Sequence, residues 1–244
     1  MLKDAIRRVL PVLPWGWATW VGRIDFYLRP HKREIWGGPF NGQTVRVSIV
    51  KAILNECAPI AIVETGTFRA ATTHFLAQST SKPVYTVERD PVNFGFASER
   101  LRGCPNVSLE ADDSRSFLRK CVKLPNLQSG PVLFYLDAHW NDDLPLAEEI
   151  EIIFSALSGA IVMVDDFQVP GEPGYIYDDF GPGKALTSEY LLGPCKKFNL
   201  IQFFPSIPAR EETGARRGCV VLAGSPVIIS RLERIPFLIR DAIG

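Results

Sequence analysis

The sequence predicts an α/β protein with a Rossmann-like, seven-stranded, mostly parallel sheet that has helices on both faces. From Thr44 onward, short apolar runs alternate with segments of helical periodicity, which is typical of parallel strands joined by helices. The last two apolar runs, 200–204 and 219–222, have no helix between them, so we expect an antiparallel C-terminal edge hairpin. The 244 residues divide into an N-terminal arm or helical region, 1–43, and a main domain, 44–244.

The elements of the main domain follow from its periodicity. The segment 45–56 has apolar residues at helical spacing, and Pro59 follows closely enough to end that helix. The other helices are expected at 69–78, 93–101, 114–122 and 145–157. The strands before the hairpin are expected at 60–63, 83–87, 107–109, 131–136 and 160–164.

Composition limits the classes of partner and the compartment. Lys plus Arg equals Asp plus Glu at 27 each, which argues against a nucleic-acid partner because phosphate contacts need an excess of clustered cations. The five cysteines are odd in number and no two are spaced as CxxC, so neither a disulfide framework nor a zinc site is expected. A reducing, cytoplasmic location fits this usage.

The N-terminal region combines charge with tryptophan. Lys3, Arg7 and Arg8 precede an apolar stretch, 9–21, that contains three tryptophans. Two prolines interrupt the stretch, and it is too short to be a transmembrane segment. It is expected either to pack on the domain or to make a peripheral contact, with a membrane surface or with a second copy in a homodimer.

A glycine turn follows the first predicted strand, in the sequence Val-Glu-Thr-Gly-Thr-Phe-Arg-Ala. Gly66 lets backbone approach a ligand closely, and the helix that follows offers unpaired N–H groups. Glu64, two residues earlier, can pair with a cationic amino group. The alternative interpretation of this segment is a strand–turn–helix connection that binds no ligand.

Acidic residues also follow the next two strands. Glu88 ends the second strand 24 positions after Glu64, a spacing at which strand-end carboxylates bind ribose hydroxyls in dinucleotide folds. Asp113 and Ser114 follow the third strand. The alternative interpretation of Glu88 is a solvated acid in a loop that binds no ligand. The alternative for Asp113 or Ser114 is that it only caps the helix that follows.

These three positions together resemble class I S-adenosylmethionine (SAM)-dependent methyltransferases, whose glycine motif is acidic-x-Gly-x-x-x-Gly. Glu64 and Gly66 match, and Ala70 stands where that motif has its last glycine. The resemblance implies that SAM binds at Glu64, Gly66 and Thr67, with Glu88 on the ribose. By the same resemblance, Asp113 and Ser114 meet the adenine amino group.

The fourth and fifth strands end in a second group of polar residues. Asp137 and His139 follow one strand, and Asp165 and Asp166 end the other. Ligands bind at the carboxyl ends of parallel strands, so these side chains are expected to meet over one crevice. Carboxylates brought together repel unless they are protonated or bridged by a cation, and oxygen ligands favour Mg²⁺, Ca²⁺ or Mn²⁺.

These strand ends resemble metal-dependent O-methyltransferases, including the macrocin O-methyltransferase type that methylates sugar hydroxyls. The resemblance implies that Asp137, Asp165 and Asp166 hold a divalent cation, in the first place Mg²⁺. An acidic cluster without metal is the alternative. His139 is a candidate general base for a substrate hydroxyl, with Asp137 as the second candidate, or else a structural histidine.

The expected function is therefore SAM-dependent O-methylation of a hydroxyl on a small molecule or glycan. A non-catalytic SAM-binding protein is the second possibility. An NAD-type oxidoreductase is the third, although the residues around Gly66 lack the G-x-G-x-x-G spacing of that class. The loop 168–183, rich in glycine, proline and tyrosine, is a candidate lid over the acceptor.

Overall fold

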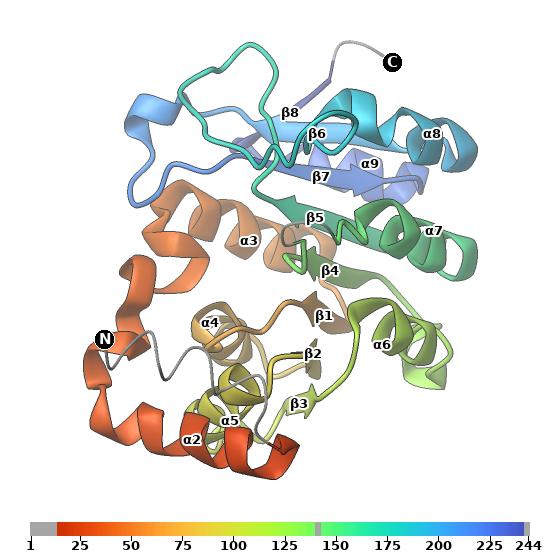
Figure 1. The fold of residues 1–244 in the computed structure, drawn as a ribbon. Helices are drawn as coiled ribbons and strands as arrows, with labels where there is room; N and C mark the ends of the chain where they lie inside the picture. Colours follow the sequence, from red (N-terminus) through yellow and green to blue (C-terminus); the bar gives the residue numbers. More distant parts are fainter. Residues whose placement is uncertain (1–13, 140–142, 242–244) are drawn as a thin grey trace.

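Eight strands form one sheet in the computed structural model, which describes residues 14–139 and 143–241 (Figure 1). The strand order is β3-β2-β1-β4-β5-β7-β6-β8. The strands are β1 (Ala61–Thr65), β2 (Val84–Val87), β3 (Val107–Glu110), β4 (Val132–Leu136), β5 (Ala160–Asp165), β6 (Ile201–Pro205), β7 (Cys219–Ala223) and β8 (Leu238–Arg240). The basic residues Lys3, Arg7 and Arg8, which belong to the expected N-terminal arm, lie outside the described residues.

The first five strands are parallel, and the expected α/β architecture is confirmed. β1 pairs with β2 and β4, and those two pair outward with β3 and β5 in the same direction. β6 and β7 pair antiparallel, as expected, and β7 lies between β5 and β6. The structure adds a short eighth strand, which pairs antiparallel with β6 and occupies the edge beyond the expected hairpin.

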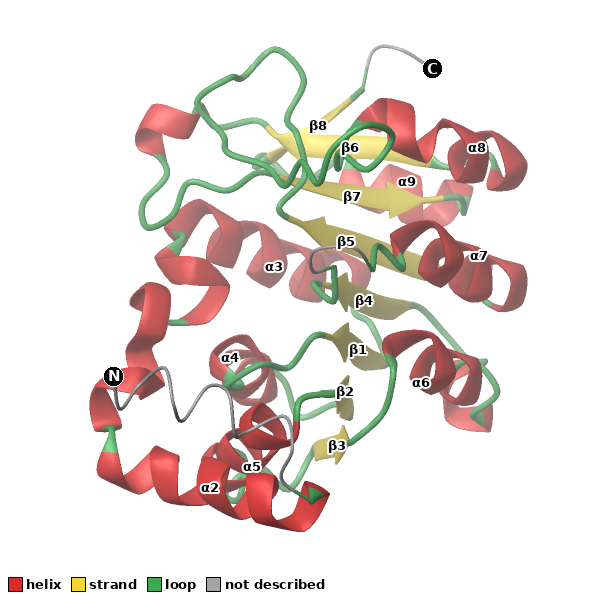
Figure 2. Ribbon diagram, in the orientation of Figure 1, coloured by secondary structure: helices red, strands yellow, loops and turns green. Residues whose placement is uncertain are grey.

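Helices cover both faces of the sheet (Figure 2). Apolar side chains of α3 (Thr44–Cys57), α4 (Ala71–Ser79) and α9 (Pro226–Leu232) pack on one face. Those of α6 (Ser114–Cys121), α7 (Leu146–Ala156) and α8 (Ser188–Phe198) pack on the other. α8 was not predicted, because its Gly193 and Pro194 read as loop residues, and the short α9 was not predicted either.

The two core layers explain why the strands read as continuous apolar runs. Every residue of β1, β4, β5 and β7 is buried, because helices cover both sides of these strands. The polar exceptions are Glu64, Thr65 and Asp165, which lie at the carboxyl ends of β1 and β5. Within these four strands, the carboxylates are thus confined to the carboxyl ends.

The described part of the N-terminal region is mostly helical. Helix α2 (Trp15–Leu28) packs against α5 (Pro91–Arg100), and two 3₁₀ segments, η2 (Pro30–Gly37) and η3 (Pro39–Gly42), lead from it to α3. In the described residues, no helix is both long enough and apolar enough to cross a membrane.

Candidate active site

The turn between β1 and α4 is held against the end of β4. Gly66 has a φ of +84°, and a Cβ there would lie 2.3 Å from the carbonyl oxygen of Asp137. Phe68 and Ala70 in the same turn also have positive φ, a conformation that costs energy for residues with a side chain. Trp36 stacks on the Phe68 ring with 5.4 Å between ring centroids. Gly66 is therefore required by the adjacent backbone, before any ligand is considered.

Glu64 lies at the end of β1 with 1% of its surface exposed. The hydroxyls of Thr73 and Thr86 both donate to its Oε2. Burial raises the pKa of Glu64 to about 7. Thr67 continues this network, because its hydroxyl lies 2.5 Å from that of Thr86 and its N–H donates to the carbonyl of Val87. Glu64 and Thr67 thus join the glycine turn to β2.

Glu88, just beyond β2, closes the other side of the turn. One carboxylate oxygen accepts the N–H of Phe68 at 2.7 Å, and the other accepts the N–H of Asp90 at 2.7 Å. Burial raises the pKa of Glu88 to about 7, although these hydrogen bonds favour the ionised form. Each oxygen keeps a lone pair for a further donor. The structure thus brings Glu64, Gly66, Thr67 and Glu88 together around one turn.

Asp113 and Ser114 lie at the start of α6. Asp113 is the N-cap, since its side chain accepts the N–H of Arg115 at 3.0 Å. The Arg115 guanidinium also pairs with Asp113 and with Asp143. Its hydrogen bond to Asp113 is the main reason that the pKa of Asp113 is lowered. The capping role is therefore observed, while the half-exposed carboxylate keeps a surface that a ligand could contact.

Asp165 is fully engaged by neighbours that the sequence did not reveal. Arg46, buried in the first turn of α3, forms an ion pair with Oδ1, and Tyr135 donates to Oδ2. Burial alone would raise the pKa of Asp165, but Arg46 and Tyr135 outweigh it and lower the pKa. The N–H of Asp166 also donates to Asp165, at 2.9 Å. Asp165, expected as a metal ligand, therefore serves in this structure to connect α3 to β5.

Asp137, His139 and Asp166 form the group whose geometry suits a metal ion. Their ligand atoms all lie within 4.8 Å of one another. Burial, together with Asp165 and Asp166, raises the pKa of Asp137 well above its ordinary value, and the pKa of Asp166 is raised to about 7. His139 is buried, and neither ring nitrogen has a hydrogen-bond partner among the described residues. Burial also lowers the pKa of His139, so the imidazole is neutral at pH 7.

Arg217 is the second cation that the sequence did not point to. It forms ion pairs with Asp166 and with Asp178, which lies in the loop 168–187. The described residues at this strand edge include four carboxylates and two guanidinium groups, namely Asp137, Asp165, Asp166 and Asp178 with Arg46 and Arg217. Two negative charges are left over when all four acids are ionised, which matches one divalent cation.

Solved structures resemble this chain, whereas no protein-family model and no curated protein sequence matches it. One is the O-methyltransferase TomG from Streptomyces achromogenes, involved in tomaymycin synthesis and in complex with SAM. It is 15% identical with a TM-score of 0.50, over 74% of this chain and 79% of that one. Another, from Klebsiella pneumoniae and assigned as an O-methyltransferase, is 13% identical with a TM-score of 0.53, over 90% and 94%.

A third is the Bacillus cereus O-methyltransferase in complex with SAH, 13% identical with a TM-score of 0.50, over 74% of this chain and 81% of that one. The chain has the class I methyltransferase fold. At 13–15% identity these likenesses establish the fold alone. Within this fold, the carboxyl ends of β1 and β2 carry Glu64, Gly66 and Glu88. The carboxyl ends of β4 and β5 carry Asp137, His139 and Asp166.

Proposed function

We propose that the chain is a SAM-dependent O-methyltransferase that methylates a hydroxyl group of a small molecule or glycan. The observation that carries this proposal is the convergence of Glu64, Gly66 and Glu88 on one turn, within a methyltransferase fold. That turn lies directly against Asp137, since the Gly66 position is in contact with the Asp137 carbonyl. A cofactor bound at the ends of β1 and β2 would therefore lie beside Asp137, His139 and Asp166 at the ends of β4 and β5.

The residues at the turn have distinct tasks in holding the cofactor. Glu88 keeps lone pairs that can accept ribose hydroxyls, while its bonds to Phe68 and Asp90 fix its orientation. Asp113 and Ser114 provide polar contacts for the adenine amino group. Glu64 and Thr67 hold the turn in shape through Thr73 and Thr86 and leave the main chain to approach the ligand. SAM, when bound, supplies an electrophilic methyl group.

We further propose that Asp137, His139 and Asp166 hold one divalent cation. Two observations support this set of ligands: the two excess negative charges, and the imidazole nitrogens, which have no hydrogen-bond partner in the part of the chain that the structure describes. Mg²⁺ and Mn²⁺ are the ions to test, because two of the three ligands are carboxylates and the third is an imidazole. Such a cation would lower the pKa of the acceptor hydroxyl and orient it. Asp165 positions Asp166 by accepting its N–H and is itself held by Arg46.

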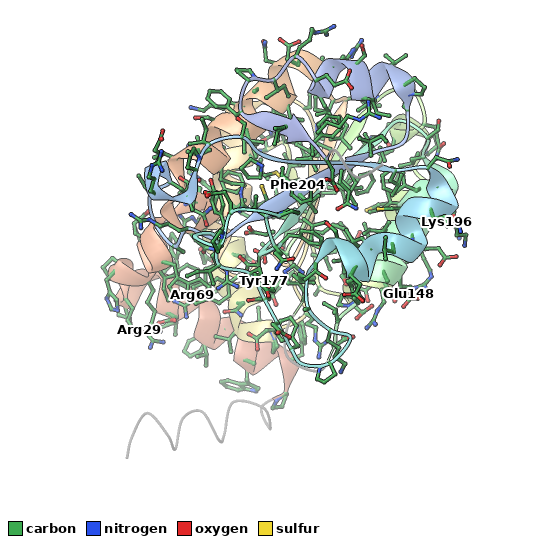
Figure 3. All side chains as sticks on the ribbon, turned by 90° about the horizontal axis from the view of Figure 1, so that it is seen from above. Arg29, Arg69, Glu148, Tyr177, Lys196 and Phe204 are labelled. Carbon is green, nitrogen blue, oxygen red and sulfur yellow. The ribbon has the colours of Figure 1, made fainter. Side chains whose placement is uncertain are left out.

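The loop 168–187 is joined to the candidate metal ligands, and we propose that it contacts the acceptor. The acceptor that we propose is polar, such as a sugar, which is the substrate class of the macrocin-type enzymes. The N–H of Asp178 donates to the carbonyl of Asp166 at 2.9 Å, and Asp178 pairs with Arg217, so the loop is joined to the metal-binding candidates. Tyr175 holds the loop down, since it is buried and donates to the carbonyl of Ile207. Tyr177, labelled in Figure 3, and Phe180 are partly exposed aromatic residues of the same loop, and we propose them as the rings that stack on an acceptor.

Thermal-shift measurements with SAM, S-adenosylhomocysteine and NAD test the proposal directly. SAM and S-adenosylhomocysteine should each raise the melting temperature in a concentration-dependent manner, and NAD should not. Stabilisation by NAD alone would overturn the methyltransferase assignment. Stabilisation by SAM, with no methyl transfer to any hydroxyl in a library of sugars and phenols, would favour a SAM-binding protein without catalysis.

A further inference from the structure

Helix α2 packs on α5 mainly through small side chains, whereas four of its large side chains point outward. The buried side of the helix contains Ala18, Thr19 and Gly22, which face α5. A Cβ at Gly22 would lie 1.9 Å from the Val92 carbonyl oxygen, and one at Gly95 of α5 would lie 1.9 Å from the Thr19 carbonyl oxygen. The two helices are therefore in close backbone contact, and the orientation of α2 about its axis is fixed.

The outward side of α2 is an aromatic and apolar stripe. Trp17 is 64% exposed and Leu28 is 75% exposed, and Trp20 and Tyr27 between them are exposed as well. The Trp17 and Trp20 rings contact each other edge to face with 6.4 Å between centroids. A surface helix normally buries such residues and exposes its small ones. The arrangement in α2 leaves four large aromatic or apolar side chains of one helix in water, a feature that marks interaction sites.

The charge of this region indicates what covers the stripe. Residues 1–43 contain seven Lys or Arg and three Asp or Glu, a net charge of +4 in a chain whose total is zero. Arg23 and Arg29, on α2 and at its end, pair with Glu99 and Asp25 but are about half exposed. A second copy of this helix would bring the same positive charge, so self-association is disfavoured. An anionic surface is complementary to it.

We propose that the outward face of α2, formed by Trp17, Trp20, Tyr27 and Leu28, binds an anionic lipid surface. The helix lies in the plane of the headgroups, where the indole rings can be partly buried while their N–H groups stay solvated. The Tyr27 hydroxyl donates to Glu99 of α5, which fixes the orientation of that ring. The cationic side chains contact the lipid phosphates. At 14 residues the helix is too short to span the bilayer.

Vesicle co-sedimentation of the full chain tests this. The probes are vesicles of phosphatidylcholine alone and of phosphatidylcholine mixed with phosphatidylserine. The protein should bind the mixed vesicles, and added salt should weaken that binding. A Trp17→Ser, Trp20→Ser double variant should lose at least about tenfold in partitioning, because burial of even one large apolar side chain is worth that factor.

The matched control is a Leu192→Ser, Val227→Ser double variant, which removes two equally exposed apolar side chains from α8 and α9. It should bind as the unmodified protein does. Absence of vesicle binding, or equal binding to neutral vesicles, would overturn the proposal. So would a dimer, seen by light scattering without lipid, that the tryptophan variant abolishes, because that result would assign the face to a second copy.

Discussion

Arg46 and Asp165 form a fully buried ion pair that joins the first turn of α3 to the carboxyl end of β5. The other terminal nitrogen of Arg46 donates to the carbonyls of Arg217 and Gly218, so one guanidinium also holds the start of β7. The charge of Asp165 is thereby compensated inside the protein. Asp137 and Asp166 are thus the carboxylates at this edge that we assign to an external cation, although Asp166 also pairs with Arg217.

Replacing Arg46 by Met should destabilise the protein by about 3–5 kcal/mol, because the buried Asp165 would lose its counter-charge. Urea unfolding measures the loss. An Arg46→Met, Asp165→Leu double variant should recover much of it, since both charges are then gone. The control is Arg234→Met, which breaks a surface pair with Glu56 and should cost no more than about 1 kcal/mol. Equal costs for Arg46→Met and Arg234→Met would contradict this account of the pair.

The sequence predicted the strand-end carboxylates because parallel topology brings the ends of β1, β2, β4 and β5 to one edge whatever the details of packing. It did not predict Arg46 or Arg217. Arg46 looked like one cationic residue on a surface helix, and its partner Asp165 is 119 positions away. Such a pairing depends on how the helix packs on the sheet, which periodicity does not specify.

The sequence also could not rank the four polar residues at the ends of β4 and β5. The spacing of Asp137, Asp165 and Asp166 fits a metal site equally well whether or not an arginine reaches Asp165. Likewise, Gly66 was expected to make room for the cofactor, but the atom nearest its Cβ position is the Asp137 carbonyl oxygen. These distinctions rest on contacts between segments far apart in the chain.

Glu88→Ala should weaken SAM binding by about 1–3 kcal/mol, the loss expected for hydrogen bonds to a charged group. Titration calorimetry measures this. Glu110→Ala is the matched control, because Glu110 also ends a strand but is exposed and paired with Lys120, and SAM affinity should not change. Unchanged affinity in a folded Glu88→Ala protein would remove Glu88 from the cofactor site.

Asp137→Asn and Asp166→Asn should each abolish measurable binding of Mg²⁺ or Mn²⁺. Asp165→Asn should weaken binding by about 10- to 100-fold, the range for residues that only support ligands. Burial and the neighbouring carboxylates raise the pKa of Asp137 and raise that of Asp166 to about 7, so a cation must displace protons from this pair as it binds. Binding should therefore release protons and strengthen as pH rises through 7. Calorimetry in buffers of different ionisation enthalpy measures the release, and its absence would count against this pair as ligands.

Glu149, in the first turn of α7, should make stability fall as pH rises. Burial raises its pKa to about 7, against an unperturbed value of about 4.3, and neither carboxylate oxygen has a hydrogen-bond partner among the described residues. A group whose folded pKa is raised contributes its full stability below the unfolded pKa and loses it as pH rises through the folded one. Glu149→Gln should thus match the parent near pH 4 and exceed it in unfolding free energy by about 4 kcal/mol above pH 7.

The neighbouring variant Glu148→Gln provides the control for that pH profile. Glu148 lies on the exposed side of the same helical turn and pairs with Arg119. Its replacement should change unfolding free energy by no more than about 1 kcal/mol at any pH. If Glu149→Gln and Glu148→Gln gave the same profile in urea unfolding from pH 4 to 8, the buried carboxyl would not be the source of the trend.

His139→Ala separates the two roles open to this histidine. As a metal ligand, His139 should be needed for cation binding, so the variant should lose calorimetric Mn²⁺ binding while SAM affinity stays near that of the parent. As a general base, it should leave cation binding intact and lower kcat by about 10²–10⁴-fold, with a rate that rises with pH through an imidazole pKa below 6.5. We expect the first result, because neither ring nitrogen has a hydrogen-bond partner among the described residues, and one ring nitrogen lies within 4.8 Å of a carboxylate oxygen of both Asp137 and Asp166. His74→Ala, which removes a partly buried histidine of α4, is the control and should change neither measurement. Retained Mn²⁺ affinity in a folded His139→Ala protein would contradict the ligand role and leave His139 as the candidate to accept the hydroxyl proton.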